Sequence, residues 1–332
     1  MLGSGEFFNF PFLVYNCKFK RPLRTYNLNR LCVGAFFLFP FSFLMIPLLK
    51  ALRPHQWIKN LFVLAALLFS KHVFDPDYIV QASLAFVSFC LISSAVYLFN
   101  DIRDRESDRN HPEKRHRPIA SGALGVSTAF IFAGLLALIA FWLAFGLQLY
   151  FGFILLVYAL LNLGYSLGLK HVVILDVMII ASGFLLRAIG GAFAIEVTIS
   201  SWFILCTMLL ALFLGFVKRR QELILLENQA GQHRRSLDDY SAQFLDQVIA
   251  IVTSGALVSY ALYTMSPEVT EKLGTPHLNL TIPFVIYGLL RYLYLVYNKG
   301  QGGDTATTLL RDFPLQLACL LWLITLGTVL YF

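Results

Sequence analysis

Apolar residues recur along this chain in windows long enough to cross a membrane as helices. The hydrocarbon core of a bilayer requires about 20 predominantly apolar residues in one helix, and nine windows from residue 58 onward come close to that length. We therefore predict an all-α polytopic membrane protein with about nine transmembrane helices. The predicted spans lie near residues 58–74, 78–99, 124–145, 148–168, 172–194, 200–217, 244–265, 279–298 and 313–331.

The first 44 residues do not follow this pattern. They are mixed and basic, and the apolar run at 34–49 is short and is interrupted by Pro40 and Pro47. No cleavage site of the A-x-A kind follows that run, as a signal peptide would require. We therefore expect an N-terminal leader at 1–44 that is interfacial or loosely attached, with Met45 as an alternative start, and a transmembrane domain at 45–332.

The composition excludes a soluble domain. The 332 residues are 58% hydrophobic and 14% charged, and the mean hydropathy is +0.69, which is far outside the range of soluble proteins. The net charge of +7 rests on few charged residues, which favours loops that face anionic lipid or an anionic substrate. A nucleic-acid-binding protein needs a broad basic surface, so we predict no nucleic-acid partner. The five cysteines form no C-x-x-C pair, so we expect neither disulfides nor a zinc site.

The basic residues lie on one side of the predicted membrane. The connections after the second, fourth, sixth and eighth spans carry most of the Lys and Arg residues, whereas the opposite connections carry little beyond Lys71 and Lys272. The positive-inside rule then places the N-terminus and the four charged connections in the cytoplasm and the C-terminus outside. We expect an integral protein of the plasma or inner membrane with its chemistry on the cytoplasmic face.

An acidic stretch follows the second predicted span. If this stretch is helical, Asp101, Asp104 and Asp108 have the spacing i, i+3 and i+7, so their carboxylates share one face, with Asn100 nearby. Such a face repels itself unless it binds a cation. Oxygen ligands of this kind suit Mg²⁺, which proteins commonly hold with a few carboxylates and the phosphates of a substrate. The sequence therefore predicts a Mg²⁺ site at these four residues.

Basic residues follow the acidic stretch directly. Lys114 and Arg117 are placed to meet the phosphates of such a substrate. A solvated loop of mixed charge is the alternative. We favour the site because five acidic and six basic residues lie within residues 100–117, at a membrane edge where charge is otherwise easily avoided.

Two more polar groups belong to the same predicted face. Tyr165 and Lys170 end the fourth predicted span, and the long connection at 218–243 begins with Lys218, Arg219 and Glu222. Lys218 and Glu222 are four residues apart. They form either a surface helix pair worth about a few tenths of a kcal/mol or a group that faces substrate, and both interpretations stay open.

Asp176 and Arg187 fall inside the fifth predicted span. An ionised side chain there costs roughly 2.5–3.5 kcal/mol on insertion scales, so each needs a partner. We expect Arg187 either to pair with Asp176, about three helical turns away, or with an acid of another span, or to face the substrate.

Several of these stretches together resemble a known family. Asn-Asp-x-x-Asp-x-x-x-Asp at 100–108 is similar to the first aspartate motif of the UbiA superfamily of intramembrane prenyltransferases. The resemblance runs from about Met45 to the C-terminus. Other stretches are most similar to the decaprenyl-phosphate phosphoribosyltransferase branch of that superfamily: Arg53-Pro-His-Gln-Trp-x-Lys59-Asn60, His111-Pro-x-Lys-Arg-x-Arg-Pro-Ile-Ala-Ser-Gly122, Lys218-Arg219-x-x-Glu222, His233-Arg-x-Ser-Leu237 and Asp312.

The resemblance implies nine helices around a central cavity that opens to the cytoplasm and the bilayer. Most members carry a second acidic cluster before the seventh span, for a second Mg²⁺ on an isoprenoid diphosphate. This chain instead has Lys218-Arg-Arg-Gln-Glu222 and, later, Asp238-Asp239. That more cationic arrangement suits an additional phosphate, such as the 5-phosphate of phosphoribosyl diphosphate (PRPP).

The resemblance therefore implies transfer of a 5-phosphoribosyl group from PRPP to a polyprenyl phosphate of the decaprenyl type. Mg²⁺ would be held by Asn100, Asp101, Asp104 and Asp108. The expected substrate-binding residues are Lys59, Lys114, Arg117, Tyr165, Lys170, Arg187, Lys218, Arg219, Glu222 and Arg234.

Two other functions stay open. An ordinary Mg²⁺-dependent prenyltransferase, which moves an isoprenoid from its diphosphate to an aromatic acceptor, uses the same first aspartate motif. A membrane transporter would place its ionisable residues near the midplane. The clustering of the acids at one helix end favours an enzyme over a transporter.

Overall fold

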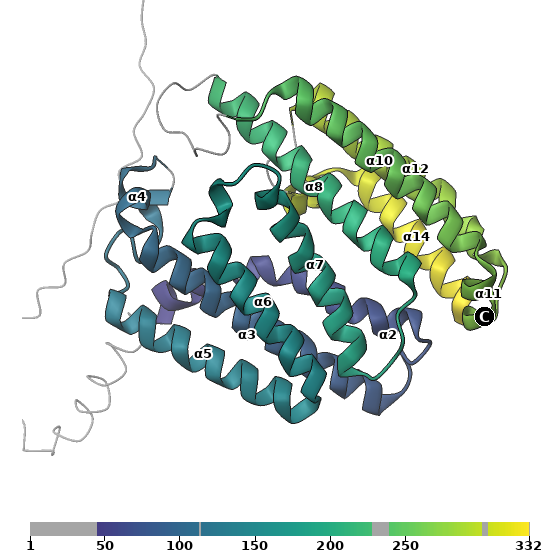
Figure 1. Ribbon diagram of the computed structural model, residues 1–332, viewed down its shortest axis with the longest axis horizontal. Helices are drawn as coiled ribbons and strands as arrows, with labels where there is room; N and C mark the ends of the chain where they lie inside the picture. The colour runs from purple at the N-terminus through teal and green to yellow at the C-terminus, as the bar shows by residue number, and fades with distance from the viewer. Residues whose placement is uncertain (1–44, 113, 228–238, 301–304, 332) are drawn as a thin grey trace, which may run out of the picture. The chain divides into compact units, whose positions relative to one another are not determined.

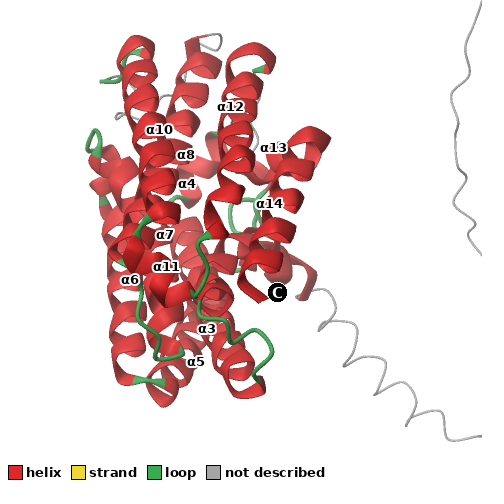
Figure 2. Cartoon of the chain, turned by 90° about the vertical axis from the view of Figure 1, so that its right-hand side faces the viewer, coloured by secondary structure: helices red, strands yellow, loops and turns green. Residues whose placement is uncertain are grey.

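The computed structural model describes residues 45–112, 114–227, 239–300 and 305–331. The predicted leader at 1–44 lies outside these residues. Within the described part of the chain all regular structure is helical, as Figure 2 shows. The prediction of an all-α membrane protein is therefore confirmed.

Eight helices are long and apolar enough to span a membrane within the described residues. They coincide with the last eight predicted spans, although several run further into the connections. They are α3 (Pro76–Arg103), α5 (Val126–Leu147), α6 (Leu149–Leu167), α7 (Leu175–Ala194), α8 (Ser201–Glu227), α10 (Ala242–Met265), α12 (Ile282–Lys299) and α14 (Phe313–Tyr331). The shorter described elements are α4 (Arg105–Asn110), η2 (Lys114–His116), η3 (Leu169–His171), α11 (Pro267–Leu273), η4 (His277–Thr281) and α13 (Thr305–Arg311).

The first predicted span, 58–74, has a different form. Residues 45–52 are α-helical, and Arg53 then takes a left-handed conformation with φ 53°, which breaks the helix before Pro54. The chain continues as a 3₁₀-helix, η1 (Pro54–Leu64), and a short α-helix, α2 (Ala65–Phe69). A 3₁₀-helix of this length is unusual and marks strain or function. Its tighter winding brings Asn60 and Val63 into the protein interior, where both are buried.

Local sequence signals set several helix ends. The Asp75 carboxylate accepts a hydrogen bond from the Asp77 N–H and caps α3. Gln148 separates α5 from α6 by a single residue, and its side-chain oxygen accepts from the Phe151 N–H at 2.7 Å. Ser241 caps α10 through the Phe244 N–H. Such caps satisfy backbone donors that a helix leaves unpaired at its start.

Successive helices pack side by side around an interior cavity. Neighbouring contacts run from α3 to α5, α5 to α6, α6 to α7, α7 to α8 and α8 to α10, and α12 packs on α14 (Figure 1). The 3₁₀-helix η1 packs against both α3 and α7. At the other end of the chain, the Tyr331 hydroxyl donates to the Leu68 carbonyl at 2.9 Å, which joins α14 to α2.

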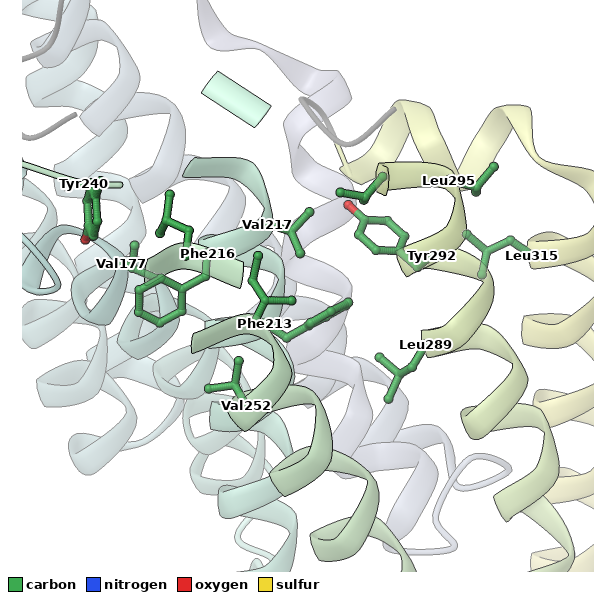
Figure 3. Close-up of a cluster of buried hydrophobic side chains, with 13 residues drawn as sticks. Val177, Phe213, Phe216, Val217, Tyr240, Val252, Leu289, Tyr292, Leu295 and Leu315 are labelled. Atoms are coloured by element: carbon green, nitrogen blue, oxygen red, sulfur yellow. The ribbon is translucent and has the colours of Figure 1, made fainter. Parts of the chain in front are cut away.

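A large apolar cluster holds α7, α8, α10, α12 and α14 together. Figure 3 shows Phe213 and Val217 of α8 meeting Leu289 and Tyr292 of α12. The ring centroids of Phe213 and Tyr292 are 5.6 Å apart in an edge-to-face arrangement, which aromatic pairs favour. This cluster fixes α8, and therefore the basic residues at its end.

The close packing of η1 on α7 depends on Gly191. A Cβ at this position would lie 1.9 Å from the Val63 carbonyl oxygen. Gly191→Ala should therefore destabilise the protein by roughly 1–3 kcal/mol, as overpacking against rigid neighbours does. Thermal unfolding in detergent measures this, with Gly134→Ala in α5 as the control because a Cβ there meets nothing within 4 Å. Equal unfolding midpoints for the two variants would contradict the packing argument.

Candidate active site

The acidic stretch lies where α3 ends. Helix α3 stops at Arg103, Asp104 leaves helical geometry, and α4 starts at Arg105. The prediction of one continuous helical face is therefore wrong in detail. The spacing survives because the Asp104 N–H donates to the Asn100 carbonyl and the Asp108 N–H donates to the Asp104 carbonyl, each at 2.8 Å.

Two arginines hold the first and last carboxylates of the stretch. Arg117 Nη1 lies 2.7 Å from Asp108 Oδ2 and 3.2 Å from Asp101 Oδ1. Arg53 Nη2 donates to the same Asp101 Oδ1 at 2.6 Å. Asp101 and Asp108 are 1% and 3% exposed, so their charges need these partners. Arg117 thus joins two of the four predicted metal-binding residues.

Asp104 has a separate cation. Lys170 Nζ lies 3.0 Å from both of its carboxylate oxygens. Lys170 belongs to η3, between α6 and α7. Arg103 joins the same segments, because its guanidinium donates to the backbone carbonyls of Ser166 and Leu167. The end of α3 is therefore bound to the α6–α7 connection by charge and by hydrogen bonds.

A second cluster forms around Arg219 in α8. Its guanidinium is 2% exposed and donates to Asp176 Oδ2 at 2.6 Å, to Glu222 and to the Tyr165 hydroxyl at 3.2 Å. The Tyr240 hydroxyl donates to Asp176 Oδ1 at 3.0 Å. Lys218 Nζ lies 3.9 Å from Glu222 Oε1. The i, i+4 pair is therefore present, but Glu222 is in closer contact with Arg219 than with Lys218.

Arg187 pairs neither with Asp176 nor with an acid of another described span, so those two of the three alternatives for it are wrong. Its Nε donates to Asn60 Oδ1 at 2.7 Å, its Nη1 to the Gly183 carbonyl at 2.8 Å and its Nη2 to the Tyr158 hydroxyl at 2.7 Å. Its guanidinium carbon also lies 4.8 Å from the centre of the Tyr158 ring. These partners are neutral, so Arg187 forms no ion pair with a carboxylate of the described residues.

A cavity of ≈ 870 Å³ lies beside these clusters. Residues of η1, α2, α3, α6, α7, α8, α13 and α14 line it, and most of them are apolar or aromatic. Lys59, Tyr165, Arg187 and Lys218, all predicted to bind substrate, are among its lining residues. The charged lining residues are three cations, and no carboxylate belongs to the described lining. A smaller cavity of ≈ 420 Å³ is lined by Lys71, Glu196 and Lys272, in the connections opposite the acidic stretch.

The acidic stretch has ligands for a metal ion, although its carboxylates do not converge on one point. No group of three or more His, Cys, Asp or Glu side chains is gathered closely enough to hold a metal ion within the residues that the structure describes. The donor chemistry nevertheless fits a hard divalent cation. Asp101 Oδ2 is buried and has no hydrogen-bond partner among the described residues, so one carboxylate oxygen is available. The amino group of Lys170 and the guanidinium of Arg117 occupy other oxygens of the stretch.

The remaining predicted residues lie at the edge of this region or beyond it. Lys114 is exposed in η2, just before Arg117. Arg234 lies outside the described residues. The structure adds Arg53, Asn60 and Tyr240, which the sequence analysis did not select as site residues. The signal for the first two was present, because both belong to the stretch at 53–60 that carries the family resemblance.

Two groups outside the membrane spans have shifted acidities. Burial and then the negative charge of Asp176 raise the pKa of Tyr240 to about 12, against the opposing effect of the Ile174 N–H. The phenol therefore stays protonated at neutral pH and remains a donor. The guanidinium of Arg291 lowers the pKa of Asp312, to which it donates at 2.7 and 3.1 Å. Asp312 also caps α14 through the Leu315 N–H.

Comparisons with known proteins agree with this arrangement. Residues 60–320 match the model of the UbiA prenyltransferase family. A decaprenyl-phosphate phosphoribosyltransferase of Mycolicibacterium smegmatis is 39% identical over 86% of this chain and 92% of its own length. A protein of the same description from Mycobacterium tuberculosis is 36% identical over 87% and 96%. A solved UbiA homologue of Archaeoglobus fulgidus, bound to GPP and Mg²⁺, has a TM-score of 0.64 at 15% identity and covers 86% of this chain and 100% of its own.

Two successive arginines of α8 allow a matched test of buried and exposed ion pairs. Arg219 pairs with fully buried Asp176, and Arg220 pairs with Asp246, whose side chain is 40% exposed. Asp176→Asn should cost roughly 3 kcal/mol or more, because it leaves a buried guanidinium poorly compensated. Asp246→Asn should cost about 1 kcal/mol or less. Thermal unfolding of the two variants in detergent compares them, and equal shifts would show that the Arg219 cluster does not depend on its burial.

Proposed function

We propose that this chain, which belongs to the UbiA prenyltransferase family, transfers the 5-phosphoribosyl group of PRPP to a polyprenyl phosphate and releases pyrophosphate. The proposal matches the description of the relatives that are 36–39% identical over most of their length. The observation in the structure that carries it is the cavity, whose apolar walls and three cationic side chains suit a lipid with an anionic head group.

The cavity supports the lipid as acceptor. Its volume of ≈ 870 Å³ lies within the usual range of ligand sites, and a lipid tail occupies apolar walls without polar partners. A phosphate head group is drawn to Lys59 and Lys218, because a cation gains most from an anion where water is excluded. No carboxylate of the described lining would repel that head group.

The acidic stretch supports PRPP as donor. We assign Asn100, Asp101, Asp104 and Asp108 as the residues that would hold Mg²⁺. The ion would offset the charge of the diphosphate. Among the residues that bind substrate we keep Lys59, Lys114, Arg117, Tyr165, Lys170, Arg187, Lys218, Arg219, Glu222 and Arg234. Arg117 and Lys170 lie against these carboxylates and are near enough to the same site to reach phosphate oxygens.

The chemistry follows from the two substrates. The C–O bond between the anomeric carbon and the diphosphate breaks, and pyrophosphate leaves with the electron pair. An oxygen of the lipid phosphate forms the new bond to that carbon. This oxygen is already anionic at neutral pH, so the protein needs no general base. Its contribution is to bind both anions in one orientation and to offset their charge.

The basic end of α8 favours this reaction over ordinary prenyl transfer. In this chain Asp176 and Glu222 both bind the buried Arg219. The guanidinium makes the local charge less negative than that of an acidic cluster, which favours an extra phosphate over a second metal ion.

The protein is an integral membrane protein, and we place its site at the cytoplasmic face. The end of α3, the connection between α6 and α7 and the end of α8 come together at one side. The connections on this side carry most of the Lys and Arg residues of the described spans, which the positive-inside rule assigns to the cytoplasm.

A purified-protein assay tests the proposal directly. The protein in detergent should release pyrophosphate from labelled PRPP when polyprenyl phosphate and Mg²⁺ are present, and should transfer the label to lipid. The comparison reaction supplies an isoprenyl diphosphate and an aromatic acid. Product from the second pair and none from the first would establish the prenyltransferase alternative instead.

Asp104 offers the cleaner test of the metal assignment. Its side chain is 26% exposed and has one cation, whereas Asp101 is buried against two arginines. Asp104→Asn should therefore abolish Mg²⁺-dependent turnover with little loss of thermal stability, while Asp101→Asn should lose both. Titration with Mn²⁺, followed by its magnetic resonance signal, measures binding without turnover. Unchanged Mn²⁺ affinity in both variants would rule out these carboxylates as metal ligands.

A further inference from the structure

Ile174 lies in a backbone conformation that costs free energy. Its φ and ψ are 67° and −46°, and the Leu175 N–H donates to the Val173 carbonyl at 2.7 Å. This combination is a γ-turn of the rare, strained kind. A β-branched residue is especially unfavourable at positive φ. Such strain persists only where surrounding contacts hold the turn in place.

The Tyr240 hydroxyl is one of those contacts. It accepts a hydrogen bond from the Ile174 N–H at 2.6 Å and donates to Asp176 Oδ1 at 3.0 Å. A single phenol hydroxyl therefore acts both as acceptor and as donor, and its two partners belong to residues 174 and 176. Tyr240 itself is 5% exposed and packs beside Val177 at one end of the apolar cluster (Figure 3). The ring is fixed by packing, and the hydroxyl is directed at the turn.

The turn connects the two halves of the candidate site. Lys170, four residues before Ile174, binds Asp104 of the acidic stretch. Asp176, two residues after Ile174, binds Arg219 at the end of α8. A change in the backbone direction at Ile174 would move one of these contacts relative to the other. A displacement of about 1 Å is enough to lower the rate of an oriented reaction about a hundredfold.

We propose that Tyr240 is a positioning residue whose hydroxyl stabilises the strained turn at Ile174. In this way it sets the distance between two contacts of the site, the Lys170–Asp104 pair and the Asp176–Arg219 pair. The proposal rests on the proposed function, because it assigns these two contacts to one reaction. The role assigned to Tyr240 needs no contact with substrate. It acts through the backbone that carries Lys170 and Asp176.

The alternative is that Tyr240 only fills the apolar cluster. Tyr240→Phe separates the two, because it keeps the ring and removes the hydroxyl. If the ring alone matters, Tyr240→Phe retains activity. If the hydroxyl holds the turn, kcat should fall by about tenfold or more, because the Ile174 N–H and Asp176 Oδ1 both lose their partner. The KM for each substrate should change little, since the binding residues remain.

Ile174→Gly provides the decisive second variant. Glycine adopts positive φ without a steric cost, so the turn no longer needs the hydroxyl. Ile174→Gly alone should keep activity within about threefold of the wild type. In the Tyr240→Phe background it should restore most of the lost kcat. Loss of kcat without this rescue would overturn the proposal, because Tyr240 would then act on substrate or on Asp176 alone.

A measurement without substrate keeps this test separate from the proposed function. Hydrogen exchange followed by mass spectrometry on the whole protein should show faster exchange of the amides at 169–176 in Tyr240→Phe than in the wild type. Tyr331→Phe is the matched control, because it removes a hydroxyl that donates to a carbonyl of α2, at Leu68, and not to residues 169–176. Unchanged exchange at 169–176 would overturn the proposal. An enzyme inactive with PRPP would refute the proposed function and leave this comparison valid.

Discussion

A charge inside a membrane protein needs a partner, and the arrangement of this site follows from that constraint. Asp101 is buried between two arginines, and Asp176 is buried against Arg219. The Arg53–Asp101 and Arg219–Asp176 pairs join residues that are 48 and 43 positions apart in the sequence. The same contacts that compensate charge therefore define which helix ends meet. The price is desolvation of both groups, which good hydrogen-bond geometry must offset.

The ion pairs of the acidic stretch also suggest how its carboxylates and basic side chains could exchange partners when substrate binds. In the protein alone, Lys170 and Arg117 neutralise carboxylates of the acidic stretch. If another cation neutralises those carboxylates, the two basic side chains become available to phosphate oxygens. The substrate-free protein then avoids both uncompensated acids and uncompensated bases. A site that binds a polyanion together with a cation can make this exchange, because the cation would replace Lys170 and Arg117 on the carboxylates and the polyanion would pair with the two released side chains.

Local patterns predicted the helices, and together with the family resemblance they proposed the residues of the site, most of which the structure places at the acidic stretch, around Arg219 or along the cavity. Hydrophobic windows give spans, and the i, i+3, i+7 spacing identified Asp101, Asp104 and Asp108 even though α3 ends between them. The partners could not be predicted from local patterns. Arg187 is eleven residues from Asp176 in one span, yet tertiary packing directs it to Asn60 and Tyr158.

Other features depend on tertiary structure in the same way. The first span is a broken 3₁₀ segment, since Arg53 takes positive φ to reach Asp101. The sequence gives no signal for the strained turn at Ile174, because a β-branched residue ordinarily argues against positive φ. One of the contacts that hold it comes from Tyr240, which lies 66 residues further along the chain. The environment of Arg187 depends on tertiary structure too: its hydrogen-bond partners Asn60, Gly183 and Tyr158 are neutral, and the residue lines the cavity. A cation in that position would favour an anionic head group over a neutral one, which accords with the phosphate that we propose on the acceptor.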